Sequence, residues 1–208
     1  MAPIVLENEA MASAIKRRIP IAPTPSHVSP DHIRLQLSMV FATIVLFSAM
    51  LAVNEWLFRW LEFAPGINYL YLPAGMRLLC TLLFAEAGAV GLLLVLWAVS
   101  FVIFFPGPFE RPFIGGIIAA AAPYLVYRLS RILYGLQASL ANLTPLRLMV
   151  LVVAYSVASP LLHHLYFAFN GQDALLQGFV AMFIGDFLGT LIVIYGIKGL
   201  LSLAPRRT

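Results

Sequence analysis

Five ionisable side chains stand inside long apolar stretches of the sequence, where they could bind a ligand or carry protons. They are Arg77, Glu86, His163, His164 and Asp186. A charge at the centre of a bilayer costs roughly 2.5–3.5 kcal/mol on insertion scales, so such groups usually face a bundle interior and find a partner. We take these five as candidate ligand-binding or intramembrane polar residues. For Asp186, a structural hydrogen bond that locks two helices is an equally open interpretation.

Asp186 lies almost midway along the last apolar stretch, residues 174–198. At ~1.5 Å per residue, this stretch is long enough to cross a ~30 Å hydrocarbon core. Arg77 stands one turn into a helix expected to begin at Pro73, and it is the only basic residue placed inside the bilayer. A hydrogen-bonded pair of opposite charges lowers the cost of burying both. We therefore predict that Arg77 is the partner of Asp186.

Two glycine pairs predict close helix packing. Gly185 and Gly189 flank Asp186 at the small-x-x-x-small spacing, and Gly115 and Gly116 stand together in an earlier apolar stretch. Small residues let the backbone of a neighbouring helix approach closely. We expect both pairs to lie at helix–helix contacts.

The ionisable groups do not form a recognisable catalytic or metal site. His163 and His164 are adjacent, so on a helix they point about 100° apart and do not easily share one metal ion. An intramembrane aspartyl protease needs two carboxylates that share a proton. The only aspartates besides Asp186 are Asp31, in a polar tail, and Asp173, in a loop. We expect no enzyme activity, no metal and no other cofactor.

The composition is that of an integral membrane protein. Of the 208 residues, 62% are hydrophobic and 11% are charged, against about 25% charged in soluble domains, and the mean hydropathy is +0.93. The net charge of +4 fits cytoplasmic loops beside anionic headgroups, and we expect no nucleic-acid partner. The single cysteine, Cys80, lies in an apolar run and excludes a disulfide framework.

The chain divides into a polar tail or linker (1–31), a transmembrane helical domain (32–203) and a short basic tail (204–208). The tail is not a cleavable signal peptide, because no apolar core follows its basic residues directly. Residues 73–105 would make a helix of roughly 50 Å, too long for a bilayer, and glycines near Glu86 offer a break. We therefore predict an all-α, polytopic bundle of about six membrane segments, one short or re-entrant. These segments are 32–58, 73–85 with a turn at 86–88 and a return to 105, 112–131, 146–169 and 174–198.

The distribution of basic residues supports six segments. With the N-terminus inside, ten of the 13 basic residues fall on the inner side, whereas a single span over 73–105 would put six of those ten outside. Cytoplasmic loops are enriched in Lys and Arg. The pattern predicts a multi-pass protein of the cell inner membrane with both termini cytoplasmic. Four aromatic residues after the first segment are typical of a membrane–water interface and predict that it lies on the outer side of the membrane: Trp56, Trp60, Tyr69 and Tyr71.

Three motifs in matching order resemble the first-type membrane-associated sensor domain, a module usually fused to bacterial diguanylate cyclases and histidine kinases. They are YLPAGMRL (71–78), ASPLL (158–162) within 146–162, and FIGDFLG (183–189). The similarity covers roughly residues 70–200. The chain is shorter than the family's eight-span module, and no output domain follows residue 203. The resemblance implies a stand-alone sensory module of a bacterial inner membrane.

Two functions from different classes remain open at this point. The first is a sensory or ligand-binding module that acts through a partner protein, with a polar site where 73–77 meets the Asp186 segment. The second is a small-solute or proton-coupled transporter, or a transporter subunit, in which a broken helix and a midplane acid bind the substrate. A purely structural bundle is a third possibility. The sequence does not identify the small-molecule ligand.

Overall fold

The computed structural model describes residues 29–107 and 109–203. The chain divides into two units, 1–34 and 35–208, and the first is described only where its helix begins. There the His32 N–H donates to Ser29 Oγ at 3.3 Å. The basic tail 204–208 and nearly all of the polar tail 1–31 lie outside the described residues.

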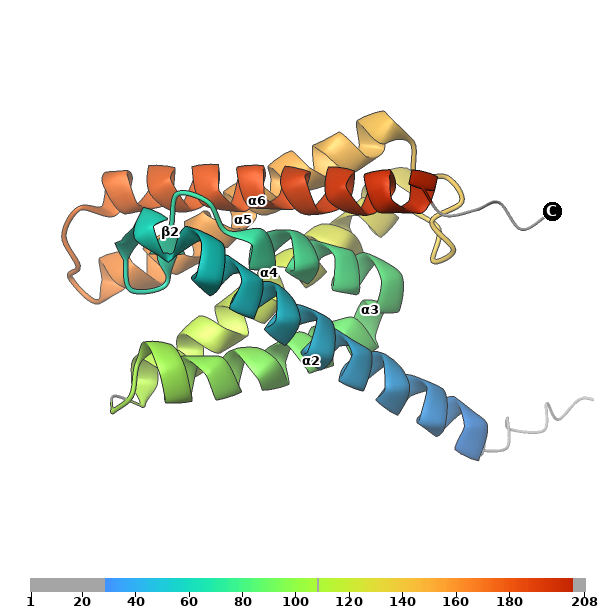
Figure 1. Ribbon diagram of the computed structural model, residues 1–208, viewed down its shortest axis with the longest axis horizontal. Coiled ribbons are helices and arrows are strands. Elements are labelled where there is room, and N and C mark those ends of the chain that lie inside the picture. Colours follow the sequence, from blue (N-terminus) through green and yellow to red (C-terminus); the bar gives the residue numbers. More distant parts are fainter. Residues whose placement is uncertain (1–28, 108, 204–208) are drawn as a thin grey trace, which may run out of the picture. The chain divides into compact units, whose positions relative to one another are not determined.

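Helices make up almost all of the described chain (Figure 1). The elements are, in order, α2 (Pro30–Phe58), the 3₁₀ turn η1 (Arg59–Leu61), β1 (Glu62–Ala64), β2 (Ile67–Asn68), α3 (Leu72–Val99), the π-helical turn η2 (Ser100–Phe104), α4 (Glu110–Tyr134), α5 (Pro145–Phe169) and α6 (Leu175–Leu203). The predicted all-α helical bundle is confirmed.

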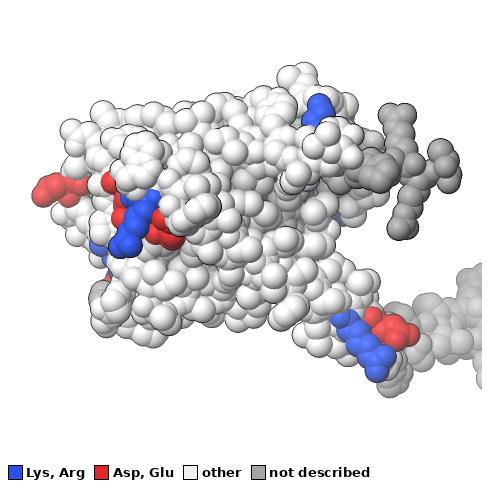
Figure 2. All heavy atoms as spheres, viewed as in Figure 1, with Lys and Arg blue, Asp and Glu red and all other residues white. Residues whose placement is uncertain are grey.

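Five stretches of helix in the described residues are long and apolar enough to cross a membrane. They are Pro30–Leu61, Leu72–Phe104, Glu110–Tyr134, Pro145–Phe169 and Leu175–Leu200. In the helical unit, charged atoms lie near the ends of the helices, and the surface between them carries almost none on the face shown (Figure 2). Such a surface, together with five candidate membrane spans, is compatible with a multi-pass membrane protein in contact with a lipid bilayer.

Helix α3 is broken at Ala85, where φ is 48° and ψ is −119°. The carbonyl oxygen of Cys80 comes so close to Gly88 that a side chain at this position would clash with it. The chain therefore turns back on itself, and Figure 1 shows the two parts of α3 running in opposite directions. We call residues 72–84 the first arm and residues 86–104 the second arm. The predicted break near Glu86 is thus present in the structure.

The first arm is an interior element of the bundle. Gly75 brings it against α6, because a Cβ there would lie 2.7 Å from Val193 Cβ and 2.9 Å from Thr190 Cα. The second arm packs on α4, where Gly116 lies against the indole ring of Trp97. The buried residues of the first arm cover nearly its whole circumference: Leu72, Pro73, Ala74, Gly75, Met76, Arg77, Leu78, Cys80, Thr81 and Leu82.

A small hairpin precedes α3, and residues 69–72, which we call the connector, link the hairpin to the first arm. Strands β1 and β2 pair antiparallel around the predicted Pro65-Gly66 turn, and Gly66 has a φ of 82° that favours glycine. The connector then crosses α6, where the Tyr71 N–H donates to the Gly185 carbonyl at 3.1 Å. Asn54 of α2 receives the Leu72 N–H at 2.9 Å. Residues 69–72 are therefore fixed from two sides, which sets the position of the first arm.

The other differences from the sequence prediction concern helix bounds. Helix α4 extends to Tyr134, beyond the predicted end at residue 131, and stops at Gly135 in the left-handed conformation. Helix α5 runs through Pro160 without interruption. A proline removes one intrahelical hydrogen bond, and the surrounding bundle tolerates that loss here.

Candidate functional site

A group of polar side chains is buried between the first arm, α5 and α6. Asp186 and Thr190 stand four residues apart on α6 and so share a face. The α5 residues Tyr155, Ser156 and Ser159 lie within about one helical turn of each other. Buried polar atoms are normally hydrogen-bonded, yet several here have no partner among the described residues. The six residues, which we call the buried polar cluster, are at most 6% exposed and are Arg77, Tyr155, Ser156, Ser159, Asp186 and Thr190.

Arg77 is the centre of this cluster. One of its terminal nitrogens donates to the Tyr71 hydroxyl at 3.3 Å, and its guanidinium carbon lies 5.1 Å from the centre of the Tyr71 ring and 5.6 Å from that of Phe47. The phenol of Tyr155 also interacts with it. Its Nε has no acceptor among the described residues. The guanidinium is thus held by aromatic rings, which leaves hydrogen-bonding capacity for a further acceptor.

Asp186 shares this interior but is not bonded directly to Arg77. The two charges interact electrostatically, and the Ser159 hydroxyl faces the carboxylate. In the described part of the chain no ion pair of 4.0 Å or less joins Arg77 and Asp186, and Asp186 Oδ2 has no hydrogen-bond donor. The direct contact that a hydrogen-bonded pair requires is therefore absent, and the two residues are members of one cluster instead.

The adjacent histidines point to different neighbours. His163 Nδ1 lies 2.9 Å from the Ser159 carbonyl oxygen, and its ring faces the backbone of Gly115 on α4. His164 Nδ1 lies 2.8 Å from the Pro160 carbonyl oxygen, and a Cβ at Gly178 of α6 would lie 2.7 Å from its Nε2. Each ring therefore bonds back to its own helix while it packs against a different helix.

A cavity of about 70 Å³ adjoins the buried polar cluster at the hairpin end of the helices. Its volume is enough for several waters, since one needs ~10–15 Å³ by this measure. Arg77 and His163 line its inner part, and Arg111 at the start of α4 is a second basic residue in the wall. The remaining lining residues are mostly apolar or aromatic: Pro65, Gly66, Ile67, Tyr71, Leu96, Ser100, Phe104, Phe105, Gly115, Ala119, Tyr166, Phe167 and Met182.

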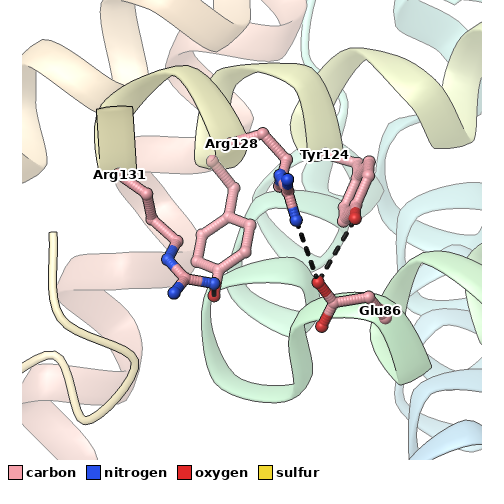
Figure 3. Close-up of polar contacts among 5 residues, drawn as sticks. Glu86, Tyr124, Arg128 and Arg131 are labelled. Carbon is pink, nitrogen blue, oxygen red and sulfur yellow. Dashed lines mark hydrogen bonds and ion pairs between the residues drawn. The ribbon is translucent and has the colours of Figure 1, made fainter. Parts of the chain in front are cut away.

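Glu86, predicted as a candidate ligand-binding or intramembrane polar residue, lies outside this site. Its carboxylate is 60% exposed and forms an ion pair with Arg128 at 3.4 Å, and it also accepts a hydrogen bond from Tyr124 at 3.3 Å (Figure 3). Arg131 lies one turn along α4 from Arg128 (Figure 3). Glu86 thus ties the turn between the two arms to the last part of α4.

The glycine predictions are correct in part. Gly185 and Gly189 do lie at close contacts, but the partner is not another helix: Gly185 meets the carbonyl oxygen of Asn68 at the end of β2, and Gly189 meets that of Tyr71 in the connector before α3. Gly116 packs tightly against the Trp97 indole, whereas a Cβ at Gly115 would meet nothing within 4 Å. Gly115 is therefore a wall residue of the cavity and not a packing residue.

Sequence reasoning missed most of the site's hydroxyl groups and misplaced one aromatic residue. Tyr155, Ser159 and Thr190 are common residues within apolar helices, and nothing in their spacing distinguishes them. Tyr71 was expected at the membrane interface with Trp56, but Tyr71 is 6% exposed and Trp56 is 83% exposed. The available signal was that Tyr71 stands six residues before a buried arginine.

Comparison of the chain with protein-family models, with curated proteins and with solved structures finds no match. The resemblance of residues 71–78, 158–162 and 183–189 to the sensor-domain family stays a prediction. The function must be argued from the buried polar cluster and its cavity.

Proposed function

We propose that this protein is an integral inner-membrane ligand-binding module with a sensory role, acting through a partner protein. The observation that carries the proposal is Arg77, a buried cation in the wall of a cavity with a nitrogen that finds no acceptor among the described residues. Binding is proposed in preference to catalysis because the cluster holds one carboxylate, Asp186, and no nucleophile paired with a base. The resemblance of three motifs to those of a sensor-domain family supports a sensory role.

The membrane arrangement proposed here has six segments, with both termini cytoplasmic and the first arm short or re-entrant. The reversal of α3 at Ala85 supports it, because the two arms then count as separate segments. The Glu86–Arg128 ion pair supports it as well, since it joins the turn to the end of α4 where the basic residues Arg128 and Arg131 gather. The cavity would then open toward the outer side.

Reporter fusions test this topology. Fusions at Ala138 and at the C-terminus should both report the cytoplasm, and a fusion at Gly171 should report the outer side, because six segments bring the chain back to its starting side. Alkaline phosphatase and green fluorescent protein activities measure the two locations. A periplasmic C-terminus would rule out six segments and favour a single span over residues 72–104.

A transporter or transporter subunit is the alternative, favoured by the broken α3 next to a buried acid. Transport of a solute or proton requires that the site open in turn to both sides of the membrane. A sensory module needs access from one side only. The two functions therefore differ in the accessibility of the cavity wall.

Cysteine accessibility separates the two functions at Gly115. A cysteine fits there, because nothing lies within 4 Å of a Cβ at this position, and the single native cysteine, Cys80, is fully buried. We expect a membrane-impermeant maleimide to label Gly115→Cys from the outer side of intact cells, and not from the cytoplasmic side of inverted vesicles. The unsubstituted protein is the control and should stay unlabelled.

Labelling of Gly115→Cys from both sides would favour the transporter. Labelling from the cytoplasmic side alone would contradict the proposed orientation of the cavity. Absence of labelling from either side would mean that the cavity is closed to solutes, which would contradict a ligand-binding role for it.

A further inference from the structure

The charged groups in the wall of the cavity all have one sign. Arg77 and Arg111 line it, and none of its described lining residues is acidic. Neither arginine forms an ion pair of 4.0 Å or less with a described carboxylate. Two guanidinium groups that lack such an ion pair, beside a cavity of low polarity, favour an anion over a neutral or cationic ligand.

Both guanidinium groups are oriented by aromatic rings. Arg111 lies 4.3 Å from the centre of the Phe105 ring and 5.7 Å from that of Phe167, and Arg77 lies over Tyr71 and Phe47. Contact with a ring face occupies the flat side of a guanidinium and leaves its N–H edge available. Arg77 also keeps an unpartnered Nε while it is 6% exposed. The available N–H groups of these arginines can donate to a planar acceptor with two oxygens, which is the geometry of a carboxylate.

The other lining residues limit the size and the polarity of the uncharged part of the ligand. Phe104, Phe105, Phe167, Leu96 and Met182 give the cavity an apolar lining. The volume of about 70 Å³ admits a molecule of only about six non-hydrogen atoms, at the ~10–15 Å³ that a water-sized group requires. Inorganic phosphate would fill the volume but would leave the aromatic wall without a partner.

We propose that this cavity binds a small organic carboxylate with a short apolar body, held between Arg77 and Arg111. The inference rests on the proposed function, since it names the ligand class of the same cavity. Asp186 interacts electrostatically with Arg77 and is not among the residues that line the cavity. It therefore weakens the attraction of Arg77 for an anion and limits the affinity of the site.

Thermal unfolding of the full-length protein in lipid nanodiscs tests the proposal with defined probes. Propanoate and butanoate should raise the unfolding midpoint with saturation, by about 5–10 °C at about 100 times the Kd. Propanamide, butanamide and propylamine are close to these probes in size but lack the negative charge, and they should have no effect. Inorganic phosphate at equal ionic strength tests whether the negative charge alone is sufficient.

Three variants test whether the carboxylate binds in this cavity. Arg111→Gln should weaken carboxylate binding about 10–100-fold, because it removes a charge-assisted contact from the partly exposed edge of the cavity. Arg128→Gln, which removes an arginine outside the cavity, should leave the binding unchanged. Asp186→Asn should tighten the binding, because it removes the negative charge that competes for Arg77.

Three outcomes would overturn the carboxylate assignment: equal stabilisation by the amides or by propylamine, stabilisation by phosphate alone, and no shift with any probe. Loss of carboxylate binding in Asp186→Asn would overturn it too, because anion binding between Arg77 and Arg111 should not depend on the negative charge of Asp186. These results leave the outer-side labelling of Gly115→Cys unchanged, so the ligand-binding module can stand when the ligand class fails. Carboxylate binding combined with labelling from both sides would instead support the ligand class and contradict the sensory function.

Discussion

Gly189→Leu should lower the thermal unfolding midpoint of the protein by about 6–12 °C. The physical reason is that a side chain here would meet the carbonyl group of Tyr71 and, at 2.9 Å, the Leu72 nitrogen. Overpacking costs about 1–3 kcal/mol when side chains can adjust, and a fixed backbone puts the cost at the upper end. A change of 1 kcal/mol shifts the midpoint of a domain this size by about 2–4 °C.

The matched control is Gly196→Leu, the same substitution two turns along α6. Nothing lies within 4 Å of a Cβ at Gly196, and leucine favours helix over glycine by roughly 0.5–1 kcal/mol. This control should therefore leave the midpoint unchanged or raise it slightly. Similar small effects of the two substitutions would mean that α6 does not contact the connector in the membrane. The displaced connector carries Tyr71, so Gly189→Leu should weaken ligand binding as well.

The elements that could be predicted from the sequence are those fixed by length and composition. Residues 72–104 are too long and too apolar for one straight span, and Gly88 permits the close approach at the break. Arg77 and Asp186 were found because a charge within an apolar run is costly and therefore conspicuous. Their burial at 6% and 1% agrees with that reasoning.

Other features depend on geometry that the sequence does not contain. The sequence predicts the turn at residues 86–88, but it does not show that Glu86 pairs with Arg128 of α4 and lies apart from the buried ionisable groups. The spacing of Gly115 and Gly116 shows that both are small but not which one faces Trp97. The sequence also does not show that residues 68–72 supply the backbone against which Gly185 and Gly189 pack.

Buried hydroxyl groups are hard to foresee for a different reason. A serine or threonine in an apolar helix can bond to the carbonyl of its own preceding turn, as Thr81 does to Arg77 at 2.8 Å. Such a residue carries no functional signal. Ser159 and Thr190 are the same residue types, but no partner satisfies them in the described residues. Only the placement of α5 beside α6 makes this difference visible.

Replacement of Arg77 by methionine should destabilise the protein by about 3–5 kcal/mol, which corresponds to a midpoint lower by roughly 6–20 °C. Methionine keeps the apolar stem, so the loss reports the charge and its hydrogen bonds. The substitution leaves Asp186 buried beside no cation, and a buried charge without compensation is costly. Asp186→Asn should cost less, because asparagine keeps the size and part of the hydrogen bonding.

The double variant Arg77→Met, Asp186→Asn should be no less stable than Arg77→Met alone. Once residue 186 is the neutral asparagine, the loss of Arg77 leaves no uncompensated buried charge. Residues that share a network show coupling energies of about 0.5–3 kcal/mol. The control is a double-mutant cycle on the exposed pair Glu86 and Arg128, with the substitutions Glu86→Gln and Arg128→Met. Its side chains are 60% and 51% exposed, so its coupling should stay below about 1 kcal/mol. Strict additivity of the Arg77 and Asp186 substitutions would show that the two charges do not act on each other, and Asp186 would then need another partner, with Ser159 the nearest candidate.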